Sequence, residues 1–574
     1  MISVLLIWLY IALTAGIVGK TVLAVFRCRP RTGVSCQLAG LVTVTVYAEF
    51  WSLFGGVGLA ANLVLLAVCM AAVILSRRGQ TRSAFFSEIR QRIQRVKRHP
   101  LGAAVITAAI LLLALGTSAG NWHIDTPLYH AQSIHWIETY GLIPGLGNLQ
   151  SDFAYNNACF SLYALYSFSW LTGQSFHAVQ GFLAVLLMLL CLPVGESETG
   201  NTSAHRLRPA DLLLLAALLQ IVFLYDELVS PSSDCFILLL VHAVILLWAR
   251  LSDTAHREAS PVPYALVAML AVYAVTVKLA AAPLLIFAVK PIFMLLKGSE
   301  KNLRVFGRFV LTALVIVLPF FARGILISGW LLYPVFPLHA GLPWKIPDGV
   351  GISESFEIRQ NGRMIFDMNQ ADTSLFGWVK GWLTGQSLKA RLLIHAAAAS
   401  VLFAMLRALV SLILHLRGTK IRYFRDACSV FTEIVLAVCV LFWFFTTPQM
   451  RFGEAYLMDL SALVFGGLIC AGTDCLRETV RNRAERLISS VIIAVSVSMA
   501  ALLFITGQVS CSQLFLQQDY ERYSVGEYRI DGVTLYYPTD YVYTGYYAFP
   551  ATRWKDENVR ALGTKITDGF AAKE

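Results

Sequence analysis

The sequence predicts an all-α, polytopic integral membrane protein, and three observations support that fold class. Only 14% of the 574 residues are charged and 57% are hydrophobic, whereas a soluble domain carries about 25% charged residues. Apolar runs of about 20 residues recur along the chain, which is the length that an α-helix needs to cross a bilayer. The period-two alternation of a membrane β-barrel is absent.

About fourteen membrane spans are predicted from these runs. They lie near residues 3–26, 35–54, 57–76, 101–119, 176–194, 210–226, 234–250, 262–277, 281–296, 306–326, 390–414, 428–446, 456–473 and 488–506. Between them, the sequence divides into an N-terminal three-span extension (1–100), a core with a first outer loop at 120–175 (101–326), a second outer loop (327–389), C-terminal spans (390–506) and a tyrosine-rich tail (507–574).

Basic residues set the predicted orientation. The net charge of +11 is typical of a membrane protein with basic cytoplasmic loops, so it does not indicate nucleic-acid binding. The most basic stretch, 77–99, is predicted to be a helix on the anionic inner leaflet, with a regulatory partner site as the alternative. With 77–99 on the cytoplasmic side, the loop at 120–175 is predicted to lie on the outer side of the membrane.

Whether the segment 158–172 crosses the membrane decides on which side of it each later loop lies. If it crossed the membrane, the basic residues of 195–209 would fall outside, against the positive-inside rule. The segment is short and rich in tyrosine, serine and tryptophan, so we predict a helix along the outer surface and place both termini outside.

Motifs for several function classes are missing. The 11 cysteines are scattered without a CxxC pair, so neither a zinc site nor a redox motif is predicted. A glycine-rich phosphate loop is also absent, which argues against a nucleotide-driven pump.

Acidic residues at the outer ends of spans are candidates for function, because charge is costly in a bilayer. Asp125 follows the span 101–119 in the stretch DTPLY. It is predicted to be either a helix N-cap or a general base. Asp226, Glu227 and Asp234 flank a later outer turn. They either cap helices in a solvated turn or bring one carboxylate, Asp234, to the same cavity as Asp125.

Cationic residues at outer ends of spans are candidates for holding a phosphate. Lys278 interrupts an apolar hairpin, where it either snorkels to the interface or binds an anion. Arg451 lies in QMRFGEAYL, where it either pairs with Glu454 or grips a lipid phosphate bidentately. Arg323 is a weaker candidate for the same task.

Aromatic and histidine side chains near Asp125 are predicted to line a substrate site. On a helix that begins at Asp125, Tyr129 and His130 lie nearby and Trp136 lies further along. Metal ligation by His130 and His135 together with Asp125 is the alternative, but a five-residue spacing does not place both histidines on one helical face. We therefore predict no cofactor, and a divalent metal is the less favoured alternative.

An ordered set of motifs resembles the GT-C superfamily of polytopic glycosyltransferases. The stretch DTPLY at 125–129 and GQSFHAVQ at 173–180 resemble the first outer loop of these enzymes. Asp234 is similar to their second acidic residue, VKLAAAP at 277–283 to their lysine hairpin, and MRFGEAYL at 450–457 to their arginine segment. The resemblance covers about residues 100–470.

The resemblance implies a fold, a site and a reaction. Members such as lipid A aminoarabinose transferases and protein O-mannosyltransferases take a sugar from a polyprenyl phosphate on the outer face. Three departures stand out: Thr126 replaces a second acid, three spans precede the usual first one, and no proline follows the arginine motif. The first departure puts a two-acid or metal-dependent site in doubt.

A second resemblance is to a poorly characterised group of bacterial membrane proteins associated with surface polysaccharide. The shared stretches are Asp125–Trp136, Pro144–Leu149, Trp330–Pro334 and Tyr546–Pro550. The expected location is the bacterial inner membrane, with the site facing the periplasm. The expected partners are a polyprenyl-phosphate-linked sugar donor, a glycan or lipid acceptor and membrane lipids, without nucleic acid. A non-catalytic transporter or flippase, or a polymerase or ligase component, is the alternative function.

Overall fold

A computed structural model describes most of the chain. It covers residues 1–28, 33–77, 100–191, 208–252, 259–297, 300–338, 341–417, 427–474 and 509–573, with single positions at 487, 490 and 498. The predicted interfacial helix over 77–99 and the predicted span 488–506 therefore lie almost wholly outside the described residues. The same holds for most of the segment 195–209.

The predicted spans in the described part of the chain coincide with helices. Eight helical segments there are long and apolar enough to cross a membrane. These are α1 (Ile2–Val25), α2 (Gly33–Ser52), α11 (Ser233–Ser252), η5 with α13 (Leu279–Leu296), α14 (Glu300–Ser328), α17 (Leu388–Leu416), α19 (Ala427–Thr446) and α20 (Met450–Asp474). The apolar stretches of α3 (Leu59–Arg77), α5 (Pro100–Ser118), α9 (Val179–Cys191), α10 (Pro209–Phe223) and α12 (Pro261–Val277) are shorter. The chain is thus a helical, membrane-embedded protein, and the number of crossings stays a prediction.

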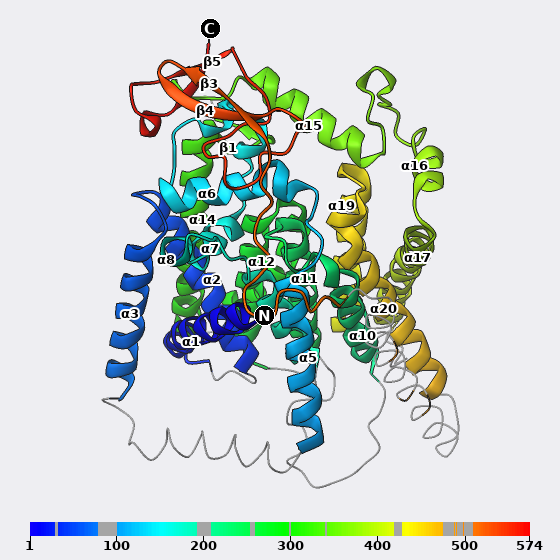
Figure 1. Cartoon of the computed structure of the whole chain (residues 1–574). Coiled ribbons are helices and arrows are strands. Elements are labelled where there is room, and N and C mark those ends of the chain that lie inside the picture. Colours follow the sequence, from blue (N-terminus) through cyan, green and yellow to red (C-terminus); the bar gives the residue numbers. More distant parts are fainter. Residues whose placement is uncertain are drawn as a thin grey trace.

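Helix α11 lies at the centre of the bundle (Figure 1). It is apolar on all sides, as expected of a helix surrounded by protein, and 83% of its apolar window is buried. It contacts α9, α10, α12, α19 and α20.

Three helix ends meet at the end of the bundle that carries the first outer loop. Helix α11 begins at Ser233, shortly after Pro231, and α20 begins at Met450, shortly after Pro448. Helix α12 ends at Val277 because the backbone of Lys278 is extended, with φ −155° and ψ 129°. These ends carry Asp234, Arg451 and Lys278.

The first outer loop is built from short helices. A π-helical turn η1 (Thr126–His130) continues directly into α6 (Ala131–Thr139), so a helix begins at Asp125 as predicted. The 3₁₀ turns η2 (Leu146–Asn148) and η3 (Ser151–Ala154) follow, and then the helices α7 (Ala158–Leu165) and α8 (Ser169–Thr172).

The segment 158–172 differs from the predicted surface helix in its first half, α7, whereas α8 in its second half has no buried residue. Helix α7 has eight residues, or about 12 Å at 1.5 Å per residue, which is too short to cross a bilayer. All eight residues are buried, and α7 packs against α2 and α6. Its one tyrosine hydroxyl, that of Tyr163, donates to the carbonyl oxygen of Ser232 at 3.2 Å, and the buried hydroxyl of its one serine, Ser161, has no partner among the described residues.

The all-α prediction missed six short strands in the described residues. They form antiparallel pairs, β1 (Trp330–Leu332) with β2 (Phe336–Pro337), β3 (Val525–Ile530) with β4 (Val533–Pro538), and β5 (Val559–Ala561) with β6 (Phe570–Ala572). The turn between β3 and β4 is Asp531-Gly532, with both φ angles positive, and Asp-Gly is a strong hairpin signal.

The second outer loop is ordered as predicted for a structured segment. After β1 and β2 it forms α15 (Asp348–Gly362), a 3₁₀ turn η6 (Met368–Gln370) and α16 (Val379–Gly385). Trp330 is buried with Tyr333 and Ile346, and its indole N–H donates to the carbonyl oxygen of Ile346 at 3.0 Å.

The tail packs on the outer loops, as predicted. Leu535 and Phe570 of the tail share a hydrophobic core with Trp136 and Ile143 of the first loop. Polar contacts add to it, because the Gln132 amide donates to the carbonyl oxygens of Gly545 and Ala548 at 3.0 and 2.8 Å. The tail therefore covers the loop that carries Asp125 (Figure 1).

Candidate functional site

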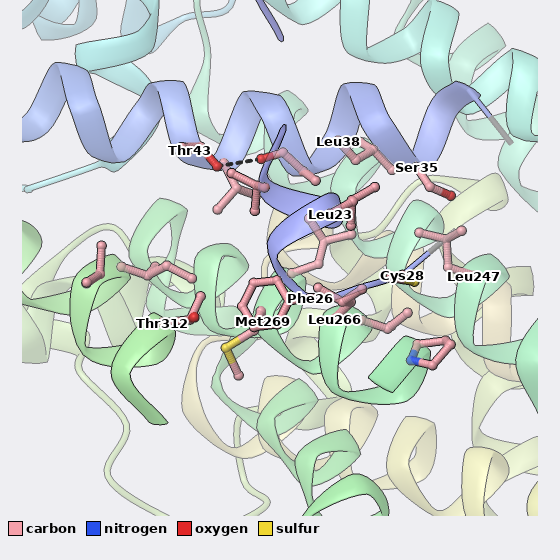
Figure 2. A pocket seen from close by; sticks show the side chains of 18 of the residues that line it. Leu23, Phe26, Cys28, Ser35, Leu38, Thr43, Leu247, Leu266, Met269 and Thr312 are labelled. Atoms are coloured by element: carbon pink, nitrogen blue, oxygen red, sulfur yellow. Dashed lines mark hydrogen bonds between the residues drawn. The ribbon is translucent and has the colours of Figure 1, made fainter. Parts of the chain in front are cut away.

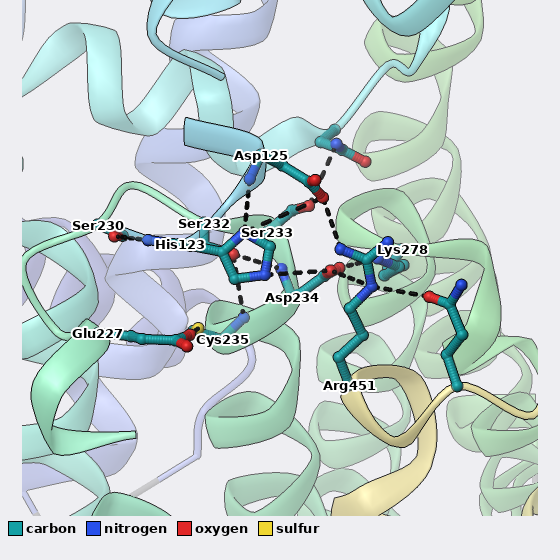
Figure 3. A network of polar contacts seen from close by, with 12 residues as sticks. His123, Asp125, Glu227, Ser230, Ser232, Ser233, Asp234, Cys235, Lys278 and Arg451 are labelled. Carbon is teal, nitrogen blue, oxygen red and sulfur yellow. Dashed lines mark hydrogen bonds and ion pairs between the residues drawn. The ribbon is translucent and has the colours of Figure 1, made fainter. Parts of the chain in front are cut away.

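Four residues singled out in the sequence come together at the end of the bundle beneath the first outer loop (Figure 3). Arg451 Nη1 lies 2.7 Å from Asp125 Oδ2, and Arg451 Nε lies 3.4 Å from Asp234 Oδ2. The Lys278 ammonium forms an ion pair with Asp234 Oδ1. With His123, introduced below, these residues form what we call the charged cluster.

The charged cluster balances two carboxylates against two cations. Burial is graded across it: the side chain of Asp234 is 4% exposed, Asp125 15%, Lys278 20% and Arg451 36%. Each cation is therefore more exposed than the carboxylate with which it pairs.

Asp125 does not use its carboxylate as a helix cap. It occupies the N-cap position of η1 without a side-chain capping hydrogen bond, and its Oδ2 accepts from Arg451 instead. Burial raises the pKa of Asp125, but the positive charge of Arg451, the largest opposing contribution, outweighs burial and holds the pKa below its ordinary value. The carboxyl is thus ionised at neutral pH and can accept a proton.

Arg451 does not pair with Glu454, the alternative considered from the sequence. Glu454 Oε1 pairs with Lys389 Nζ at 2.8 Å. Arg451 Nε donates to Gln449 Oε1 at 2.8 Å as well as facing Asp234. This arrangement turns the guanidinium toward the two carboxylates, and its fork of donors suits a phosphate.

Lys278 forms an ion pair within the charged cluster. The alternative considered from the sequence was a lysine that snorkels to the membrane interface. Its ammonium lies 3.9 Å from the centre of the Phe452 ring, and the Arg451 guanidinium carbon lies 5.1 Å from the same ring. Phe452 thus places an aromatic face beside both cations. The sequence analysis did not single out Phe452, although it directly follows Arg451.

His123 is a second member of the site that the sequence analysis missed. The backbone N–H of Asp125 donates to His123 Nδ1 at 3.2 Å, so the ring proton belongs on Nε2, which faces Asp234 Oδ2 at 3.8 Å. Burial lowers the pKa of His123, which agrees with a neutral ring. Its position two residues before Asp125 was the available signal.

The same residues offer a set of metal donors. Atoms of His123, Asp125 and Asp234 lie within 4.8 Å of one another, and imidazole with carboxylates is a ligand set for transition metals. Lys278 and Arg451 already neutralise both carboxylates, however. A metal ion at this position would have to displace two cations.

The predicted lining residues separate into two groups. His130 is fully buried beside the cluster, with its ring 5.8 Å from that of His123, and Tyr129 contacts His130 at 4.4 Å between ring centres. Trp136 instead lies in the core shared with the tail. His135 is stacked between Tyr546 and Phe549, with ring centres 4.1 and 3.8 Å away.

The weaker charged candidates have partners outside the cluster. Arg323 donates to Asn156 Oδ1 at 3.1 Å and to Ser52. Asp226 accepts from the Asn121 amide, and Glu227 accepts from Cys235 at 3.2 Å.

An apolar cavity of about 400 Å³ lies deeper in the bundle, away from the cluster (Figure 2). Side chains of α1, α2, α11, α12 and α14 line it, among them Leu38, Leu247 and Met269. Leu247 is thirteen residues after Asp234, or about 20 Å further along α11. The cavity is lined mostly by apolar side chains, with Cys28 and Arg250 among the exceptions.

Comparison with known proteins yields a family without an assigned function. No curated protein matches the chain, and no solved structure matches it. A family model described as a domain of unknown function (DUF8201) matches residues 1–458. The match includes every residue of the charged cluster. The chain therefore belongs to the DUF8201 family.

Proposed function

We propose that this protein is a membrane glycosyltransferase that moves a sugar from a polyprenyl-phosphate-linked donor to a lipid or polysaccharide acceptor. One observation carries the proposal. Asp125, Asp234, Lys278 and Arg451, which lie up to 326 residues apart in sequence, meet at one end of the helical bundle. Buried ionisable groups in a membrane protein are expensive and mark functional sites.

The two cations are suited to the phosphate of the donor. Lys278 supplies a compact charge and Arg451 a planar fork, and both are more exposed than the carboxylates they pair with. As the bond between the sugar and the phosphate breaks, negative charge grows on the leaving phosphate. Fixed cations stabilise that charge more in the transition state than in the ground state.

Asp125 is suited to the role of general base. Its carboxylate takes the proton of an acceptor hydroxyl while the hydroxyl oxygen attacks the anomeric carbon of the sugar. The carbon–oxygen bond to the lipid phosphate breaks, and the phosphate leaves with the electron pair. The donor supplies the energy, so no nucleotide is required.

The remaining residues of the site position these groups. Asp234 holds Lys278 and the base of the Arg451 guanidinium, and neutral His123 accepts from the backbone N–H of Asp125 while its Nε2 faces Asp234. Tyr129 and His130 lie beside the cluster on the side of the first loop. Trp136 is not assigned to the sugar site, because it lies in the core beneath the tail.

The proposed location is a bacterial inner membrane with the cluster facing the periplasm. This orientation follows from the positive-inside rule applied to the basic loops. The location, like the polyprenyl carrier, rests on the resemblance to GT-C enzymes.

The first experiment measures phosphate binding and sugar transfer separately. Full-length protein in lipid nanodiscs is titrated with a short-chain isoprenyl phosphate, and transfer is followed with a labelled polyprenyl-phosphate sugar. Lys278→Gln should weaken binding about 10- to 100-fold, because a charge-assisted hydrogen bond is worth roughly 1.5–3 kcal/mol. Lys290→Gln is the matched control, since Lys290 lies over Tyr264, away from the cluster.

Two outcomes would contradict the proposal. If Lys278→Gln binds the isoprenyl phosphate as tightly as the unaltered protein, the phosphate does not lie at this cluster. If the protein binds the lipid, and translocates it when reconstituted into sealed vesicles, but transfers no sugar from any donor tested, a flippase explains the same cations better.

A further inference from the structure

A second polar contact joins the same two helices beneath the charged cluster. His242 Nδ1 of α11 lies 2.8 Å from Asp459 Oδ1 of α20, and the two side chains are 0% and 1% exposed. His242 follows Asp234 by eight residues, and Asp459 follows Arg451 by eight. The helices thus carry two polar contacts, about 12 Å apart along their axes. The sequence analysis assigned neither His242 nor Asp459 a role.

Hydrogen bonds around the pair indicate which atoms of His242 carry protons. Lys389 pairs with Glu454 Oε1, and Glu454 Oε2 accepts from the Gln220 amide nitrogen at 3.2 Å. The amide oxygen of Gln220 therefore faces His242 Nε2, at 3.5 Å. Because an amide oxygen can only accept, Nε2 carries a hydrogen. One further proton then lies between His242 Nδ1 and Asp459 Oδ1.

The surroundings of Asp459 indicate where that proton lies. Among the described residues, Asp459 Oδ2 is buried and has no hydrogen-bond partner. An ionised carboxylate with one oxygen unsatisfied in an apolar interior is far more costly than a neutral carboxylic acid. The acid form leaves only a carbonyl oxygen without a partner, and its O–H donates to Nδ1.

We propose that Asp459 is a protonated acid and that Asp459 and His242 form a neutral brace that positions Arg451. The brace holds α20 against α11 two turns below the site. It keeps the helix in register when a bound phosphate draws Arg451 away from Asp125 and Asp234. Because the brace carries no net charge, it does not alter the charge balance of the cluster above it. Asp459 and His242 are thus positioning residues that act through Arg451, which goes beyond the roles assigned under the proposed function.

Three variants test the brace through phosphate binding. Asp459→Asn keeps a donor toward His242 Nδ1 and should bind a short-chain isoprenyl phosphate within about twofold of the unaltered protein. Asp459→Ala removes the donor and should bind about tenfold more weakly. Ser461→Ala, a buried polar residue on the same helix whose hydroxyl has no described partner, is the control and should bind normally. Equal loss in Asp459→Asn and Asp459→Ala would overturn the neutral brace.

An infrared measurement tests the protonation of Asp459 independently of any ligand. The difference spectrum between the unaltered protein and Asp459→Asn at pH 7 should contain a protonated carboxyl C=O band, which His242→Gln shifts. Absence of that band overturns the proposal, whether or not the variants fold well enough for titration. If the unaltered protein binds no phosphate but shows the band, the proposed function fails and the protonated brace stands.

Discussion

Replacing Asp125 by asparagine is predicted to slow sugar transfer and to tighten phosphate binding. The cluster holds two carboxylates and two cations, so the substitution leaves it with one net positive charge. Turnover should fall because a general base contributes about 10²- to 10⁴-fold. Binding of an isoprenyl phosphate should become tighter, because Arg451 loses its competing partner.

Coulomb's law gives the size of the gain in binding. If the carboxylate lies about 6 Å from a phosphate held by the same guanidinium, the repulsion is about 3 kcal/mol at an effective dielectric constant of 20 and about 0.7 kcal/mol in water. Arg451 is 36% exposed, so the site lies between these limits. We expect binding to tighten about tenfold, which corresponds to about 1.4 kcal/mol.

The assay pairs calorimetric titration of the isoprenyl phosphate with single-turnover sugar transfer, both in nanodiscs. Asp226→Asn is the matched control, because this carboxylate accepts from Asn121 and makes no described contact with the cluster cations. It should change neither quantity. Transfer by Asp125→Asn at the unaltered rate would refute the role of Asp125 as base. Weaker phosphate binding by the same variant would refute the placement of the phosphate at Arg451.

Three other predictions concern pH, the tail and metal ions. Neighbouring positive charge holds the pKa of Asp125 below its ordinary value of 3.8, so kcat/KM should not fall between pH 7 and pH 5. A fall in kcat/KM within that range would contradict the assignment of Asp125 as the general base. Tyr546→Phe removes the hydroxyl that donates to the half-buried Glu138 at 2.5 Å. It should destabilise the tail by about 1–3 kcal/mol, seen as faster proteolysis of the tail. Tyr541→Phe, whose side chain is exposed, should not change that proteolysis. Chelation of divalent ions should leave the rate of sugar transfer within about twofold of the untreated rate, since Lys278 and Arg451 already pair with both carboxylates. If chelation abolishes transfer and added Mn²⁺ or Zn²⁺ restores it, a metal at the cluster is favoured instead.

Local sequence was sufficient for some features of the site and not for others. Asp125 was recognisable because a carboxylate directly after an apolar run is costly and rare. His242 and Asp459 carried the same kind of signal, since both interrupt apolar runs, but hydropathy does not tell which interior charges face each other. The position of His123, two residues before Asp125, was a signal in the sequence, but its role follows only from the direction of its ring nitrogens.

By itself, the sequence determined the membrane class, the positions of the helices and the first outer loop at 120–175, because hydrophobicity and helix signals are properties of neighbouring residues. Only the tertiary structure decided which side chains and which segments contact each other. Arg451 faces Asp125 rather than Glu454, α7 is enclosed rather than exposed, and the tail folds into strands over the loop. These outcomes depend on contacts between segments hundreds of residues apart, where a side chain's partner is set by helix packing and not by its position in the chain.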